Sequence, residues 1–302
     1  MNLDTEQLQK QFGRNLIIKE SLSKYSWFNL GGPADIFFRP ENKKQLIEFL
    51  EEVRKKNSNI NILGAGSNTL IRDSGVKGPV IKLGSKFSFI KLLEKDKLEV
   101  GAATLDRKVS EFAKNNGICN LEFLSCIPGS IGGAVIMNSG CYGSNISDIL
   151  LSIQVIDNKG KEREIKKDDI KFFYRGTNIP SDYLILSAIL KGNTSSKEEI
   201  AKKQEEFINK KKMSQPSQIK TGGSTFKNSD KKKAWELIKE SGCDKFYVGD
   251  ARISEKHCNF FVNNGNASTS DIEKLIRNVK QEVQSKTGVC LELEIKIIGD
   301  EK

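Results

Sequence analysis

Two glycine-rich segments are the first places in this sequence where residue types and spacing indicate a specific chemistry. Gly64-Ala65-Gly66-Ser67-Asn68-Thr69 directly follows the apolar segment INIL, and residues 127–134 contain three glycines and a serine. Glycine lets the backbone approach an anion closely, and successive N–H groups in such a turn form a concave donor site. Two loops of this kind in one domain suit a pyrophosphate bound from both sides. For the first loop alone the alternative is a tight turn, and for the second it is a glycine-rich bend packed under a sheet.

The first loop does not complete the dinucleotide-binding fingerprint of a Rossmann fold. It lacks the third glycine, and no helix opens from it. The pattern therefore argues against a standard Rossmann site.

Three further side chains have the right chemistry for a reaction at a carboxylate-bearing substrate. The planar guanidinium of Arg175 suits binding a carboxylate and opposing charge that builds on it, although a surface ion pair is the alternative. Ser224 lies in a GGST turn with no GxSxG motif, so it is not a hydrolase nucleophile. Alternation along residues 289–298 places Glu292 and Glu294 on one strand face, opposite the apolar face.

The chain contains a single histidine, His257, and six cysteines without a CxxC pair. A lone histidine is more often a structural hydrogen-bonding group than a catalyst. We expect no metal site and free thiols.

The motifs together resemble the UDP-N-acetylenolpyruvoylglucosamine reductase family. GAGSN near 64 and IPGSIGGAV near 127 look like the two pyrophosphate loops of the vanillyl-alcohol-oxidase type (PCMH) FAD-binding fold. Tyr174-Arg175, GGSTFKN at 222–228, ISEKHCNF at 253–260 and the terminal LELEIKIIG follow in the family's order. The resemblance covers about Ser23 to Gly299. The short connection after Arg175 places the chain in the subclass that lacks the tyrosine-bearing lid loop.

The resemblance implies a role for each matching residue. Arg175, Ser224 and Glu294 would be catalytic, with Ser224 as the proton donor. FAD would be held noncovalently, since the only histidine lies outside the expected FAD domain, and NADPH would be the co-substrate. The implied FAD contacts are Gly64, Ala65, Gly66, Ser67, Asn68, Thr69, Gly101, Ala102, Pro128, Gly129, Ser130, Gly132, Gly133 and Ala134. The implied substrate contacts are Asn138, Tyr174, Lys227, Asn228, His257 and Asn259.

The pattern of elements around these motifs predicts an α+β protein. We expect an N-terminal helical arm at 1–20, a two-lobed FAD-binding domain at 21–192 and a C-terminal α+β substrate-binding domain at 200–302, with the active site between the two domains. Helices are expected at 41–57, 105–116, 195–212, 233–241 and 269–286, and a long terminal strand at 289–298.

Composition limits the partners. The formal charge of +10 includes lysine runs at 210–212 and 231–233, but aromatic residues for base stacking are not interleaved with them. We therefore expect no nucleic acid, no membrane, small-molecule substrates, a cytoplasmic location and a monomer. Two alternatives stay open: an oxidase or dehydrogenase of alcohols or sugar lactones on the same flavin fold, and a basic non-enzymatic module that binds RNA or anionic lipid.

Overall fold

The computed structural model describes residues 3–56, 58–157, 160–230 and 232–301 and has the expected α+β composition. Lys231 of the second lysine run and the outermost residues of the two terminal segments lie outside these ranges. The chain divides into two compact units. The first unit comprises residues 1–18, 36–65 and 78–211, and the second comprises residues 19–35, 66–77 and 212–302.

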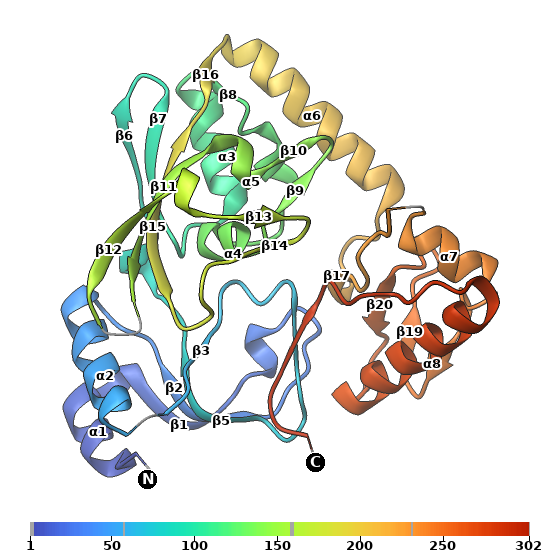
Figure 1. The fold of residues 1–302 in the computed structure, drawn as a ribbon, viewed down its shortest axis with the longest axis horizontal. Coiled ribbons are helices and arrows are strands. Elements are labelled where there is room, and N and C mark those ends of the chain that lie inside the picture. The colour runs from blue at the N-terminus through green and yellow to red at the C-terminus, as the bar shows by residue number, and fades with distance from the viewer. Residues whose placement is uncertain (1–2, 57, 158–159, 231, 302) are drawn as a thin grey trace. The chain divides into compact units, whose positions relative to one another are not determined.

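The first unit is built around a five-stranded antiparallel sheet with the order β12-β11-β15-β7-β6 (Figure 1). Its strands are β6 (Ile90–Glu94), β7 (Lys97–Gly101), β11 (Leu150–Ile156), β12 (Glu162–Lys166) and β15 (Leu184–Lys191). The inner strands β11 and β15 carry mostly buried residues, as expected for strands that are covered by helices.

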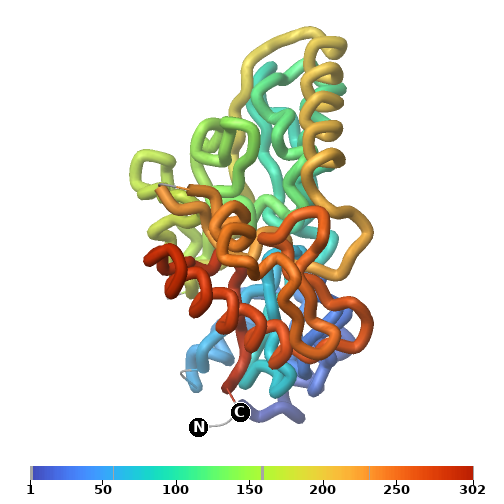
Figure 2. Tube along the Cα trace, turned by 90° about the vertical axis from the view of Figure 1, so that its right-hand side faces the viewer, coloured from blue at the N-terminus to red at the C-terminus, as the bar shows by residue number. Residues whose placement is uncertain are grey.

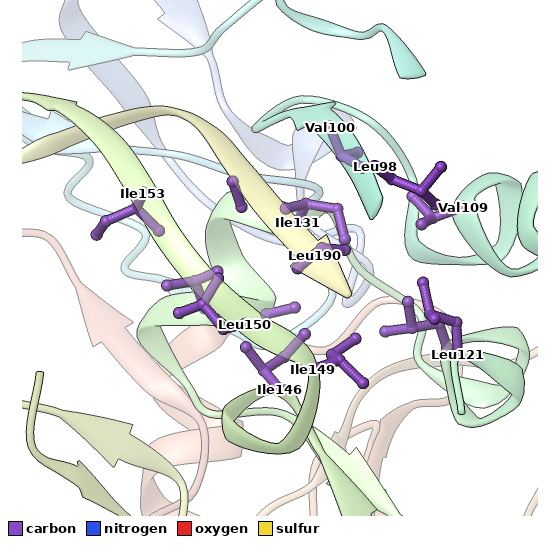
Figure 3. Close-up of a cluster of buried hydrophobic side chains, with 14 of the residues drawn as sticks. Leu98, Val100, Val109, Leu121, Ile131, Ile146, Ile149, Leu150, Ile153 and Leu190 are labelled. Atoms are coloured by element: carbon purple, nitrogen blue, oxygen red, sulfur yellow. The ribbon is translucent and has the colours of Figure 1, made fainter. Parts of the chain in front are cut away.

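Short helices pack against this sheet and close its core. They are α3 (Asp106–Asn115), α4 (Ile131–Ile136) and α5 (Ile146–Ile149). Figure 3 shows Ile131 beside Leu190 and Ile146 beside Leu150, and all four belong to one cluster of buried hydrophobic residues. The segment that follows the second glycine loop is therefore anchored by apolar side chains.

A long helix, α6 (Lys197–Ser214), runs beside α3 (Figure 2). Gln204 of α6 is buried. Its Nε2 donates to the carbonyl (2.9 Å) and to the hydroxyl (2.7 Å) of Ser110 in α3. The predicted helix at 195–212 is confirmed.

A second core of the first unit lies between helices and a four-stranded sheet with the order β1-β2-β5-β3. The elements are α1 (Thr5–Phe12), α2 (Lys43–Lys55), β1 (Leu16–Ser21), β2 (Pro33–Phe38), β3 (Asn61–Ile62) and β5 (Val76–Ile81). The rings of Phe38 and Phe49 stack at 4.0 Å, and Phe12 meets both edge-on. Strand β3 pairs in parallel with β5, and the first glycine loop follows β3.

The second unit contains an antiparallel sheet with the order β17-β20-β19-β18; α8 packs on this sheet, and α7 packs on α8. Its elements are β17 (Lys220–Ser224), β18 (Tyr247–Val248), β19 (Ala251–Ile253), β20 (Phe260–Asn263), α7 (Ala234–Glu240) and α8 (Thr269–Thr287). Helix α8 begins with a capping box between Ser268 and Asp271 and ends at Gly288, whose φ is 71°.

The last predicted strand is shorter than expected. Only β21 (Lys296–Ile298) is a regular strand, and it pairs in parallel with β4 (Thr69–Ile71). Leu293 forms an isolated bridge with Phe226. The expected alternation holds in part: Leu291 and Ile295 are buried and Glu292 and Lys296 are exposed, but Leu293, Glu294 and Ile297 are all half-buried.

Candidate functional site

The two predicted phosphate loops meet in the first unit. A Cβ atom placed on Gly64 would lie 3.3 Å from the Oγ of Ser130. The Gly132 amide donates to the carbonyl of Ala102 (2.9 Å), and a Cβ at Gly132 would lie 3.1 Å from the Cβ of Ala102. At Gly133, by contrast, an added Cβ would meet nothing within 4 Å. The backbone of the second loop is therefore held against Ala102 at Gly132, and there is space beside the backbone at Gly133.

The second half of the first loop belongs to the second unit. Gly66 has φ +73°, and a Cβ there would lie 1.8 Å from the carbonyl oxygen of Tyr25, so only glycine fits. Asn68 donates from Nδ2 to the carbonyl of Glu294 (3.1 Å), and the Lys296 amide donates to the carbonyl of Asn68 (2.9 Å). These bonds fix the predicted cofactor loop to the segment that carries Glu294.

Lys82 adds a positive charge beside the first loop. It follows β5 and donates from Nζ to the carbonyl oxygen of Gly64. Burial, with a smaller contribution from the charge of Arg39, lowers the pKa of Lys82 to about 8. Sequence reasoning missed this residue, although its place at the end of a strand beside INIL was a usable signal.

A buried carboxyl group supports the second loop. Asp106, the first residue of α3, is fully buried, and neither carboxyl oxygen has a hydrogen-bond partner among the described residues. Burial raises the pKa of Asp106 well above its ordinary value. A Cβ at Gly129 would lie 2.7 Å from Oδ2 of Asp106. The sequence pattern did not predict that Asp106 lies beside Gly129.

Gly64, Ser130, Gly133 and Lys82 together form a cradle whose chemistry fits FAD. A pyrophosphate needs closely approachable backbone and positive charge, and Gly64, Gly133 and Lys82 provide both in the first unit. Ser130 is buried directly beside Gly64 and can contribute a hydroxyl group.

Arg175 lies at the tip of a small ribbon in the first unit. The ribbon pairs β13 (Phe172–Phe173) with β14 (Gly176–Thr177), which leaves Tyr174 and Arg175 as the turn. Arg175 has φ 58°, lies 5.0 Å over the Tyr174 ring, and donates from Nη2 to the carbonyl of Gly140 (3.0 Å). The guanidinium is therefore held at this turn by the carbonyl of Gly140 and by the Tyr174 ring.

Asn138 supports the same ribbon. Its side chain is buried; Nδ2 donates to the carbonyl of Phe173 (3.2 Å), and Oδ1 accepts from the Ser147 amide (3.0 Å). The amide thus connects the ribbon to α5 from the end of α4. The sequence predicted a substrate contact here, whereas the described partners of the amide are backbone groups.

Ser224 is placed by an irregularity in the second unit. Thr221 pairs with Val262, but Ser224 pairs with Phe260, so the register shifts across Gly222 and Gly223. Gly223 has φ +79°. Bulges of this kind redirect a side chain, and here the redirected side chain is that of Ser224.

Glu294 lies on the segment next to Ser224. The Glu294 amide donates to the carbonyl of Thr225 (2.9 Å), and the Lys227 amide donates to the carbonyl of Glu292 (2.8 Å). Glu292 has a side chain 75% exposed and forms an ion pair with Lys227 (3.5 Å), whereas Glu294 is half-buried. The structure thus brings two of the three predicted catalytic residues onto adjacent segments.

Three other predicted substrate residues lie around this segment. Asn228 accepts from the Ala234 amide at Oδ1 (3.0 Å). His257 accepts from the Asn259 amide at Nδ1 (3.3 Å) and packs edge-on against Phe260. Burial lowers the pKa of His257, so its imidazole is neutral near pH 7 with the proton on Nε2.

The predicted residues fall into two sets. In the first unit lie Gly64, Ala65, Gly101, Ala102, Pro128, Gly129, Ser130, Gly132, Gly133, Ala134, Asn138, Tyr174 and Arg175. In the second lie Gly66, Ser67, Asn68, Thr69, Ser224, Lys227, Asn228, His257, Asn259 and Glu294.

Two family models match the chain. Residues 34–166 match a family described as FAD binding domain, and residues 214–298 match one described as UDP-N-acetylenolpyruvoylglucosamine reductase, C-terminal domain. No helix in the described part of the chain combines the length and apolar character needed to cross a membrane.

Several relatives share most of the chain. A UDP-N-acetylenolpyruvoylglucosamine reductase of Pelagibacter ubique is 50% identical over 280 residues, which is 92% of each chain. The enzyme of the same name from Rickettsia akari is 44% identical over 92% of this chain and 94% of its own. The crystal structure of the Thermus caldophilus UDP-N-acetylenolpyruvylglucosamine reductase superposes with a TM-score of 0.81 at 32% identity, covering 94% of this chain and 98% of its own.

Proposed function

Because the chain belongs to the UDP-N-acetylenolpyruvoylglucosamine reductase family, we propose that it reduces UDP-N-acetylglucosamine enolpyruvate to UDP-N-acetylmuramate, with NADPH as reductant, in peptidoglycan precursor synthesis. The observation that carries the proposal is the pairing of the Ser224 and Glu294 segments through the carbonyl of Thr225. It places a hydroxyl-bearing and a carboxyl-bearing segment side by side, as a proton transfer requires.

FAD, when bound, supplies the means to take hydride from NADPH and deliver it to the substrate alkene. We assign its binding to the domain at 21–192, with Gly64, Ser130, Gly133 and Lys82 around the pyrophosphate. The segment 200–302 is assigned to the substrate. The cytoplasmic location and monomeric state expected from the sequence belong to the same proposal.

The substrate's alkene is conjugated to a carboxylate, so hydride addition builds enolate charge on that carboxylate. Arg175 opposes this charge with its guanidinium, which its bond to the Gly140 carbonyl holds in place. The hydroxyl of Ser224 then protonates the adjacent carbon, and Glu294 supports the enol and the proton transfer. A serine hydroxyl is a weak acid, so it donates only to a strongly basic carbon held within hydrogen-bond reach.

The remaining predicted contacts suit the polar body of the substrate. Tyr174 is half-exposed beside Arg175, and the ammonium of Lys227 suits a phosphate. The Nε2–H of His257 and the amide nitrogen of Asn228 are donors suited to sugar hydroxyl groups.

The test is an anaerobic absorption experiment on the purified protein. Oxidised-flavin bands should bleach when NADPH is added and return when UDP-N-acetylglucosamine enolpyruvate follows. Flavin that ignores NADPH would instead favour the oxidase alternative. A protein with no affinity for FAD would contradict the proposal altogether.

A further inference from the structure

Asn259 has an unusual set of bonds in the second unit. Its side chain is 3% exposed. Oδ1 accepts from the amide of Phe226 (3.0 Å), and Nδ2 donates to the carbonyl of the same residue (2.8 Å). Both ends of the side-chain amide are therefore bound to one residue, as a neighbouring strand would bind it.

The main chain of Asn259 extends this contact by one residue. Its carbonyl accepts from the amide of Thr225 at 2.7 Å. Three hydrogen bonds from Asn259 thus reach the two residues that immediately follow Ser224. Regular pairing ends at this point, because Ser224 is the last residue of β17 and its partner Phe260 is the first of β20. The side-chain amide continues the ladder where the backbone does not.

The segment held by Asn259 in turn holds Glu294. The carbonyl of Thr225 accepts from the Glu294 amide (2.9 Å), and Phe226 bridges to Leu293. A displacement of residues 225 and 226 would therefore move both the hydroxyl that precedes them and the carboxyl segment beside them.

We propose that Asn259 is a positioning residue that fixes the Ser224 hydroxyl relative to Glu294 through the backbone of Thr225 and Phe226. This inference rests on the proposed function for its catalytic meaning and on the hydrogen bonds for its geometry. The same burial and bonding argue against direct contact with substrate, because a substrate-binding amide must present a donor or acceptor to solvent before the substrate arrives.

The test uses Asn259→Asp, whose protonation state can be chosen. The neutral acid has one donor and one acceptor, like the amide, whereas the carboxylate would face the carbonyl of Phe226 with no proton to donate. Burial raises the pKa of the introduced carboxyl, so the carboxyl stays protonated up to a higher pH than an exposed aspartate would and is neutral in mildly acidic solution. The reoxidation rate with the enolpyruvyl sugar, taken as a ratio to the native protein at each pH, should fall about tenfold or more from pH 6 to 9. The native protein carries the same His257, Glu294 and Lys227, so the ratio isolates position 259.

Two readouts separate positioning from binding and from loss of fold. Reduction by NADPH and the dissociation constant of the sugar should stay within about twofold of the native values. Asn263→Asp is the matched control, since Asn263 is also buried and its amide bonds to the carbonyl of Phe28 and the amides of Gly265 and Ala267. It should lower the melting temperature without this pH-dependent change in the ratio.

A third readout is independent of the substrate. In Asn259→Ala, hydrogen exchange at the amides of Phe226 and Glu294 should be at least tenfold faster than in the native protein, and in Asn263→Asp it should not. Unchanged exchange at these amides would overturn the proposal, as would a normal reoxidation rate with a weakened sugar affinity. Failure of the proposed function would appear differently, as native protein that the sugar does not reoxidise.

Discussion

The Arg175 ribbon in the first unit and the Ser224 segment in the second are both held by a buried asparagine, but in different ways. Asn138 joins two separate elements, with one bond to the ribbon at Phe173 and one to Ser147. Asn259 commits its whole side-chain amide to Phe226, inside a sheet. The ribbon has strands of two residues each, and Phe173 and Tyr174 on it are at least half-exposed.

This difference matches what each group has to do. A guanidinium has several donors and a long side chain, so it can follow a carboxylate that shifts slightly. A proton donor acts only within hydrogen-bond reach of one carbon. The Ser224 segment, whose backbone is more strongly fixed, therefore carries the proton donor. The more exposed ribbon carries the positive charge of Arg175.

The largest expected effects come from removing these two groups. Arg175→Ala and Ser224→Ala should each lower the rate of substrate reduction on the order of a hundredfold or more, because a preorganised donor contributes about 3–4 kcal/mol. FAD should stay bound in both, as its absorption spectrum would show. The matched control is Thr225→Val, which removes a buried hydroxyl that has no hydrogen-bond partner among the described residues. Near-normal reduction by Ser224→Ala would contradict the serine assignment.

The two units differ also in how their glycines act, and Gly66→Ala is expected to have the next largest effect. The added Cβ would lie 1.8 Å from the Tyr25 carbonyl at a φ of +73°, which should destabilise the protein by about 3 kcal/mol. In Gly133→Ala the Cβ meets nothing, so stability should be unchanged or slightly higher. Thermal unfolding of the two apoproteins measures this contrast. FAD affinity should nevertheless fall in Gly133→Ala, and an unchanged dissociation constant would remove Gly133 from the cradle.

Asn138 allows the support of the ribbon to be measured. Asn138→Ala should destabilise by about 1–3 kcal/mol, because the Phe173 carbonyl and the Ser147 amide lose their partner. Asn138→Gly loses the same bonds, but glycine tolerates the φ of 42°. The difference in unfolding free energy between the glycine and alanine variants therefore measures the backbone strain at this position. Denaturant unfolding gives both values. If the ribbon positions Arg175, both variants should also slow substrate reduction; normal rates would make the support purely structural.

The smallest expected effect concerns Lys82. Its pKa of about 8 means that its charge is lost as the pH rises through 8, so FAD affinity should decline over that range. The change should stay below about tenfold, since a partly solvated ion pair contributes about 1 kcal/mol or less. Lys82→Met should abolish the pH dependence, and Lys86→Met, at an exposed lysine, should retain it. For the apoprotein the sign is opposite. Unfolded Lys82 still binds its proton between pH 8 and 10.5 while the folded form releases it, so stability should rise with pH in that window.

The sequence predicted the elements whose pattern is local. The apolar spacing and caps of α2, α3, α6 and α8 were sufficient to place them within a few residues, and their identity as helices is confirmed. The terminal strand was overestimated because alternation describes which face is buried, not which residues find a backbone partner; here the partner changes from Phe226 to β4.

What could not be predicted depends on contacts between distant segments. Nothing in the spacing of Asn138 or Asn259 indicates that their amides bind backbone, since the partners are set by tertiary packing. Asp106 was missed for the same reason, because its burial beside the second glycine loop appears only in three dimensions, whereas Lys82 at least had a signal in its place at the end of a strand. The loop motifs themselves were found because glycine-rich turns are a local sequence pattern, set by the backbone conformation and the close approach that glycine permits.

The pairing of β4 with β21 sets an order on events during synthesis. Thr69 lies opposite Lys296, so the half of the glycine loop that begins at Gly66 must wait for its partner while on the order of 200 further residues are made. At bacterial elongation rates this takes on the order of ten seconds or more. Gly64 and Ala65 lie in the other unit, so the pairing of β4 with β21 concerns only the half of the loop that begins at Gly66. The nascent chain can therefore acquire a complete binding loop only after its last hundred residues have emerged.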